Sequence, residues 1–227
     1  IIRTYKNIST KVNLRRSAKA RRVTIKINHN KQVELVIPII ISVEQARKFL
    51  VAKQTWIFNK LKEVKGPEEF TESGIIPIFG VRHKIIHTFL QNDIYVKMED
   101  KFLKVNCPPD KIKEILTEFF KDFFLKEITK IAEYVSEKMK LSFKKIRISN
   151  AMTKWGSCSS NKTLSFNWRL VFAPKEVVAY VVIHEIAHLK EMNHSKTFWE
   201  LVRSVDADFM VAIKWLKEHR SVLYSFL

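Results

Sequence analysis

The feature that most constrains the fold is an apolar segment that follows Pro174 and contains two histidines, His184 and His188. Proline is favoured in the first turn of a helix, so the segment is predicted to be a helix that begins at Pro174 and runs through both histidines. A helix that is apolar on most of its surface belongs inside the protein. Its apolar residues are Val178, Val181, Val182, Ile183, Ile186 and Ala187.

Within this helix, His184, Glu185 and His188 form the pattern His-Glu-x-x-His. Residues four apart lie about 40° from each other on adjacent turns, so the two imidazoles face one point. Glu185 lies beside them, where its carboxylate can reach a metal-bound water without taking a coordination position. Burial of this group without a metal would be costly. The pattern therefore predicts zinc as cofactor, with Glu185 as catalytic base.

A third ligand is expected at His194, although a continuing helix would rotate it by about 240° beyond His188. The helix must therefore end between the two, and Asn193 tolerates the left-handed conformation that ends helices. Ser195 can then cap the next helix. Three histidine ligands leave a fourth position for water, which is typical of a catalytic site. The alternative third ligands are Glu191, Glu200, Asp206 and Asp208.

The formal net charge of +18 indicates polyanionic partners such as nucleic acid or nucleotides. Lysines outnumber arginines 30 to 11, however, and the chain is rich in Ile, Asn and Phe, as coding bias in an AT-rich genome would produce. Both explanations stay open. The basic residues that could gather a triphosphate are Lys11, Arg15, Arg16, Lys19, Arg21, Arg22 and Lys26.

Cysteine content and hydropathy favour a cytoplasmic protein. The two cysteines, Cys107 and Cys158, are far apart, so a disulfide framework is not expected. No signal peptide and no apolar run near 18 residues is found, so no membrane association is expected. The chain begins with Ile, and a lost leader stays open.

The N-terminal half is predicted to be rich in strands. Residues 21–37 alternate polar and apolar side chains on either side of a turn, as in a hairpin. Ser42 and Gln45 form a capping box for a helix to about Lys62. Short apolar runs from 75 to 105 are expected to form a meander that continues the N-terminal sheet. His83 and His87 would lie about 13 Å apart on one strand, too far to share an ion.

The second half begins after a boundary at residues 107–111. Asp110 can cap a long helix to about Met139. Three short strands follow, with a Gly-Ser turn, then the histidine helix and two short helices at about 195–204 and 207–219. The prediction is an α+β fold of two domains: residues 1–108, a β-rich module with one helix, and residues 109–227, a catalytic domain with the metal helix buried.

The stretch from Lys154 to Trp199 resembles the YgjP-like metallopeptidase family, which is related to the SprT-like and WLM zincins. The resemblance rests on residues 155–158, residues 167–170 and the histidine-rich helix, and it extends to the N-terminal hairpin. It implies a zincin-like fold with His184, His188 and His194 as ligands of one Zn²⁺ and Glu185 as base.

Two kinds of hydrolysis fit such a site. The first is peptide cleavage by zinc-bound water that Glu185 activates. The second is attack of the same water on a phosphoanhydride bond of a nucleoside triphosphate, as in a nucleotide (NTP) pyrophosphohydrolase. A SprT-like protease acting on proteins attached to nucleic acid is a further alternative, as is a non-catalytic nucleic-acid-binding protein with a zinc-stabilised core. The oligomeric state is left open.

Substrate-binding residues are expected in the strands before the metal helix, because a strand there commonly binds extended substrate in zincins. The candidates are Lys154, Trp155 and Arg169, and either Lys154 or Arg169 could neutralise charge that develops in the reaction. Gly156 is expected in a turn near the cleft, and Cys158 is expected to be a small packed residue rather than a nucleophile.

Overall fold

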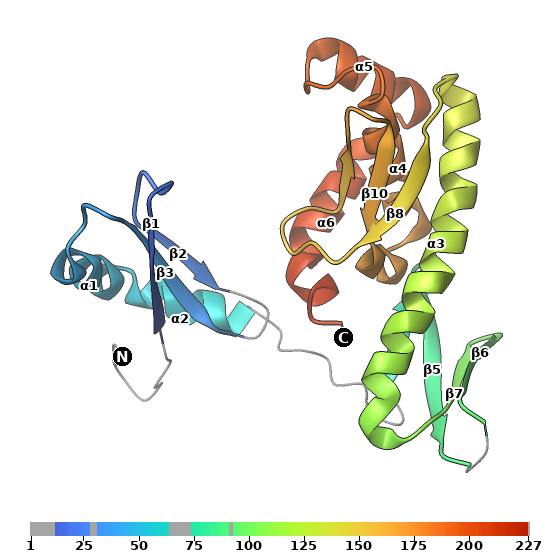
Figure 1. Cartoon of the computed structure of the whole chain (residues 1–227), viewed down its shortest axis with the longest axis horizontal. Coiled ribbons are helices and arrows are strands. Elements are labelled where there is room, and N and C mark those ends of the chain that lie inside the picture. The colour runs from blue at the N-terminus through green and yellow to red at the C-terminus, as the bar shows by residue number, and fades with distance from the viewer. Residues whose placement is uncertain (1–11, 28–30, 64–73, 91–92, 227) are drawn as a thin grey trace. The chain divides into compact units, whose positions relative to one another are not determined.

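The computed structural model describes residues 12–27, 31–63, 74–90 and 93–226, and within them the fold is α+β, with three small sheets and six α-helices (Figure 1). The chain divides into two compact units, one of residues 1–68 with 224–226 and one of residues 69–223. The expected boundary after residue 108 differs from this division. No helix in the described part of the chain is both long and apolar enough to span a membrane.

The first unit is a three-stranded sheet with two helices. Strands β1 (Val12–Ser17), β2 (Thr24–Ile27) and β3 (Val33–Pro38) lie in the order β1-β3-β2, with β3 parallel to β1 and antiparallel to β2. The predicted pairing of the two halves of residues 21–37 is therefore confirmed, although most of its turn, residues 28–30, lies outside the described residues. The core of this unit contains Val12, Val33, Leu35, Ile37, Ala46, Leu50 and Ile57.

The helical part of the first unit is split in two. The capping box of Ser42 and Gln45 is present and opens α1 (Val43–Ala52), and α2 (Gln54–Glu63) follows. The prediction of one helix to Lys62 is wrong in this detail. The backbone N–H of Lys53 bonds to the carbonyls of both Phe49 and Leu50, and the regular helix is interrupted there.

The second sheet contains β4 (Ile75–Ile78), β5 (Val81–Thr88), β6 (Tyr95–Glu99) and β7 (Phe102–Asn106). Its order is β4-β5-β7-β6, and β5 pairs with β7 in parallel. The expected meander that continues the N-terminal sheet is therefore wrong. The strands form two hairpins joined through a non-local parallel pair, and no sequence period reports such a pairing.

The long helix α3 (Ile112–Met139) ends where the sequence predicted. Its expected cap is wrong, because Asp110 lies in a short 3₁₀ turn (Pro109–Lys111) and Lys111 occupies the N-cap position without a side-chain bond. One face of α3 is buried along its whole length, through Leu116, Phe120, Phe124, Ile128, Ala132 and Val135.

The third sheet positions the site. Its strands β8 (Lys145–Ser149), β9 (Gly156–Cys158) and β10 (Thr163–Asn167) lie in the order β8-β10-β9, so β9 is an edge strand. Gly156 and Ser157 are in β9 and not in the turn that was expected. A 3₁₀ turn, η2 (Trp168–Phe172), leads to α4 (Lys175–Ala187), and α5 (Lys196–Val205) and α6 (Phe209–Leu223) complete the unit.

Candidate functional site

Helix α4 carries the first residues of the candidate site. Its apolar side chains are buried as predicted, whereas His184 and His188 are half-buried. The ring centroids of these two histidines lie 4.9 Å apart. Helical geometry alone therefore brings the pair together.

His194 joins this pair. A ligand nitrogen from each of His184, His188 and His194 lies within 4.8 Å of the others. The Nε2 atoms of His184 and His194 are 3.0 Å apart. Of the described residues that could ligate a metal, these three are the group that comes together; Glu191, Glu200, Asp206 and Asp208 are not part of it.

The chain reaches His194 by a different turn from the one predicted. Helix α4 already ends at Ala187, and Leu189, Lys190 and Glu191 donate backbone hydrogen bonds to carbonyls at residues 186 and 187. Asn193 is not among the described residues with positive φ, so its expected left-handed conformation is wrong. The predicted cap is correct, since the Ser195 hydroxyl accepts from the N–H of Phe198 at the start of α5.

Phe198 packs against the rings of all three histidines, a contact that sequence reasoning did not identify. Its ring is fully buried, and its centroid lies 4.7 to 4.9 Å from all three imidazoles. The sequence places Phe198 in the first turn of a capped helix, but that pattern does not report which side chains it will contact.

The hydrogen bonds of the imidazoles fit a metal ion. His188 Nδ1 lies 2.9 Å from the carbonyl of Glu191, to which only an N–H can donate. His184 Nδ1 lies 3.4 Å from the hydroxyl of Tyr180. With hydrogen on Nδ1, the Nε2 lone pairs of both residues are available to a metal ion. Zinc–nitrogen bonds of about 2.0–2.1 Å are compatible with nitrogens this close.

Burial also keeps these imidazoles in the form that binds metals. Burial, together with the charges of the nearby His188 and His194, lowers the pKa of His184 to about 4. The pKa of His188 is lowered mainly by burial as well. A neutral imidazole is the ligating form, so no proton competes near neutral pH.

Glu185 lies on the same helix, and its side chain is 6% exposed. Burial raises the pKa of Glu185 to about 7, while the charge of Lys154 and a hydrogen bond from the backbone N–H of Cys158 act in the opposite direction. This N–H belongs to β9, which therefore contacts the carboxylate directly. A Cβ atom at Gly156 would lie 2.5 Å from Glu185 Oε1, so only glycine fits this contact without a shift.

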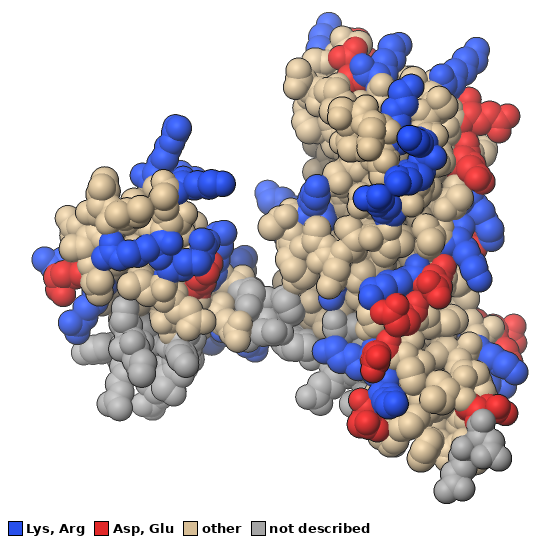
Figure 2. Space-filling model, in the orientation of Figure 1, with Lys and Arg blue, Asp and Glu red and all other residues tan. Residues whose placement is uncertain are grey.

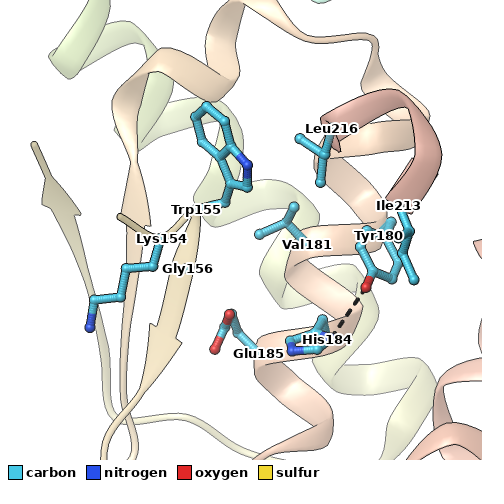
Figure 3. A pocket seen from close by; sticks show the side chains of 9 residues that line it. All are labelled: Lys154, Trp155, Gly156, Tyr180, Val181, His184, Glu185, Ile213 and Leu216. Atoms are coloured by element: carbon cyan, nitrogen blue, oxygen red, sulfur yellow. Dashed lines mark hydrogen bonds between the residues drawn. The ribbon is translucent and has the colours of Figure 1, made fainter. Parts of the chain in front are cut away.

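A pocket of about 320 Å³ adjoins His184 and Glu185 (Figure 3). Its lining comes from the two residues before β9 with the first residue of that strand, from α4 and from α6. The lining residues are Lys154, Trp155, Gly156, Tyr180, Val181, His184, Glu185, Ile213 and Leu216. Two of the three expected substrate-binding residues, Lys154 and Trp155, are thus in the pocket, while the contributions of Ile213 and Leu216 were not foreseen.

The third expected substrate-binding residue, Arg169, lies outside the pocket. It is 6% exposed in η2, its guanidinium lies 4.5 Å from the Trp168 ring, and it donates to Asn150 Oδ1. It does not line the pocket. These contacts indicate a structural role in place of the expected contact with substrate.

The remaining candidates fall outside the group of three histidines. His83 Nδ1 contacts the Val81 carbonyl, and His87 Nε2 contacts the Cys107 carbonyl. Cys158 is half-buried in β9, and burial, together with the charge of Glu185, raises the pKa of its thiol. A raised pKa disfavours the thiolate that a nucleophile requires.

Comparison with known proteins identifies the family. The family described as "YgjP-like, metallopeptidase domain" matches residues 21–219. Comparison with curated proteins gives no match. Among solved structures, the metallopeptidase zymogen of Pyrococcus abyssi abylysin is 20% identical with a TM-score of 0.37, covering 40% of this chain and 93% of its own. The metallopeptidase zymogen of Methanocaldococcus jannaschii jannalysin is 24% identical with a TM-score of 0.35, covering 42% and 96%.

The family match covers most of the chain, including the whole candidate site. It gives no support to hydrolysis of nucleotides. The chain belongs to the YgjP-like metallopeptidase family and is a metal-dependent hydrolase.

Proposed function

We propose that this protein is a zinc-dependent peptidase in which His184, His188 and His194 hold one zinc ion and Glu185 is the general base. The observation that carries the proposal is the convergence of three imidazoles beside a buried carboxylate on the same helix. Neutral imidazoles are good zinc ligands, and a set of three leaves a position open for water or substrate.

The ion, when bound, supplies Lewis acidity that polarises the scissile carbonyl and makes a water molecule more acidic. Glu185 accepts the proton of the attacking water and delivers it to the departing amine nitrogen. Lys154 and the N–H of Cys158 favour the ionised form of Glu185, which is the form a base requires. Tyr180 holds the His184 ring in orientation through Nδ1.

The edge strand β9 is suited to align an extended peptide. The carbonyl of Trp155 and the N–H of Ser159 bond to β10. Because backbone groups alternate in direction along a strand, those of Gly156 and Cys158 face away from β10. The N–H of Cys158 reaches Glu185, which places this side of the strand next to the proposed reaction centre. A peptide added along β9 would therefore pass the metal ligands.

The pocket beside the metal ligands is suited to an apolar side chain of the peptide. Trp155, Val181, Ile213 and Leu216 supply apolar lining. A volume of about 320 Å³ is at the lower end of the range for small-ligand sites, about 300–1,000 Å³, so it suits one bulky residue. We therefore expect cleavage next to a large apolar residue.

The proposal is tested by digestion of casein and of a mixed peptide library with the zinc-loaded, full-length protein. Glu185→Gln should retain zinc and lose at least about 100-fold in kcat, because it keeps the shape of the side chain and removes the base. Glu176→Gln is the matched control, since Glu176 is an exposed acid in the first turn of the same helix. Wild-type turnover by Glu185→Gln would refute the assignment of the base. No cleavage by the zinc-loaded wild type would refute the peptidase proposal.

A further inference from the structure

The positive charge of this protein is distributed unevenly along the chain. Residues 1–68 contain 16 Lys and Arg against 4 Asp and Glu, a net charge of +12. Residues 69–227 contain 25 against 19, a net charge of +6. The N-terminal 68 residues also hold 6 of the 11 arginines. A coding bias that acts on the whole gene does not explain why two thirds of the charge falls in less than a third of the chain.

Five of these cations form what we call the basic cluster: Arg15 in β1, Lys26 in β2, and Lys19, Arg21 and Arg22 in the connection between the two strands. All five are exposed. Figure 2 shows Lys and Arg side chains prominent on the face of this unit that is in view.

The cluster has little acidic compensation. Across the sheet, Glu34 of β3 lies opposite Lys26 and forms an ion pair with Arg15 at 2.8 Å. Apart from this cross-strand neighbour of Lys26, no described acidic residue lies within ion-pair distance of Lys19, Arg21, Arg22 or Lys26. Among the described residues these four side chains thus form no internal ion pair, and their mutual repulsion costs free energy that a bound anion would offset.

The chemistry of the cluster favours phosphodiesters. Three of its five members are arginines, whose planar guanidinium binds phosphate oxygens in pairs. Leu50 and Ile57 of α1 and α2 pack in the core of the unit, whereas Val51, Trp56 and Phe58 are exposed, so an anionic membrane surface is the competing ligand that the experiment must separate. We propose that the basic cluster binds the phosphate backbone of nucleic acid without reading its sequence. This inference goes beyond the peptidase activity and does not depend on it.

The test measures binding of the full-length protein to fluorescein-labelled DNA, single-stranded and duplex, by fluorescence anisotropy across a series of salt concentrations. Each phosphate contact contributes about 0.7 to 0.9 to the slope of log K against log salt, so four to five contacts predict a slope of about −3 to −4. In a variant with four of the five cations removed, the magnitude of this slope should fall by about 3, and the DNA should bind at least about tenfold more weakly. Its substitutions are Lys19→Gln, Arg21→Gln, Arg22→Gln and Lys26→Gln.

The control variant removes the same number of charges from exposed lysines of the other unit: Lys101→Gln, Lys113→Gln, Lys126→Gln and Lys138→Gln. It should bind as the wild type does. Should the fourfold variant fail to fold, Arg21→Gln with Arg22→Gln alone should lower the slope by about 1.5, from two contacts. Equal losses in the two fourfold variants would overturn the proposal, and so would binding that salt does not weaken. Equally tight binding to anionic vesicles or to polyglutamate would overturn it as well.

Discussion

Substitution of Gly156 by alanine tests whether β9 positions the proposed base. The added Cβ would lie 2.5 Å from Glu185 Oε1, 2.6 Å from Cγ and 2.8 Å from Cδ, where ordinary contacts begin at 3.4 Å. Either the backbone at residue 156 or the side chain of Glu185 must move by about 0.9 Å, the difference between 3.4 and 2.5 Å. Glu185 lines the pocket, so its side chain can retreat into that space only by leaving its hydrogen bond with the N–H of Cys158. Overpacking of this kind costs about 1–3 kcal/mol of unfolding free energy.

The effect on catalysis should be larger than the effect on folding. A misplacement of about 1 Å at a reacting group costs about 100-fold in rate. We therefore expect Gly156→Ala to lower kcat about 100-fold while the protein retains its zinc, because the three atoms nearest to the added Cβ all belong to Glu185 and none to a histidine. Ser157→Ala, at the next position of the same strand, is the control and should keep nearly wild-type kcat. The assay combines peptide kinetics, zinc content after dialysis and thermal unfolding.

A double-substitution cycle separates this explanation from general damage. Glu185→Ala deletes all three atoms that the new Cβ would contact. Gly156→Ala should therefore destabilise the wild type by about 1–3 kcal/mol but the Glu185→Ala variant by close to zero. An equal loss of stability in both backgrounds would refute the steric reasoning, and unchanged kcat in Gly156→Ala would refute the role of this contact in catalysis.

Three further substitutions test other parts of the site. His194→Ala should weaken zinc binding by at least about tenfold because it removes a ligand. His219 lies outside the group of three histidines, so His219→Ala should leave zinc binding unchanged. Equal zinc affinity of the two variants, measured with a chelating indicator, would contradict the assignment of His194 as third ligand. Ile213→Ala should enlarge the pocket and shift kcat/KM by about tenfold or more in favour of larger apolar residues, as read from cleavage of a peptide library; an unchanged preference would remove the pocket from substrate recognition. Ser195→Ala should lower the unfolding free energy by about 1 kcal/mol, because it removes the side-chain cap of α5. It should also weaken zinc binding, because α5 carries Phe198, which packs against the histidines. Chemical denaturation measures the stability and the chelating indicator measures the zinc affinity; wild-type stability would contradict the role of the cap.

Much of the candidate site could be predicted from the sequence because its spacing is local. His184 and His188 are one helical turn apart, so their convergence follows from the geometry of a single helix. His194 also lies beside the other two histidines, as the sequence predicted, and its role as a ligand stays a prediction. The predicted turn was wrong, because α4 ends at Ala187 with short-range backbone hydrogen bonds of residues 189–191 and not with a left-handed Asn193.

Other features depend on contacts between distant segments, and only the tertiary structure decided them. The approach of Gly156 to Glu185, the contact of Phe198 with the histidines and the pocket wall from Ile213 each join elements that no sequence period connects. The parallel pairing of β5 with β7 is of the same kind. Local patterns report which face of an element is apolar, and they do not report which element will cover it. The sequence by itself therefore determined the metal ligands and the base as candidates, while the packing of β9, α5 and α6 decided the shape of the site around them.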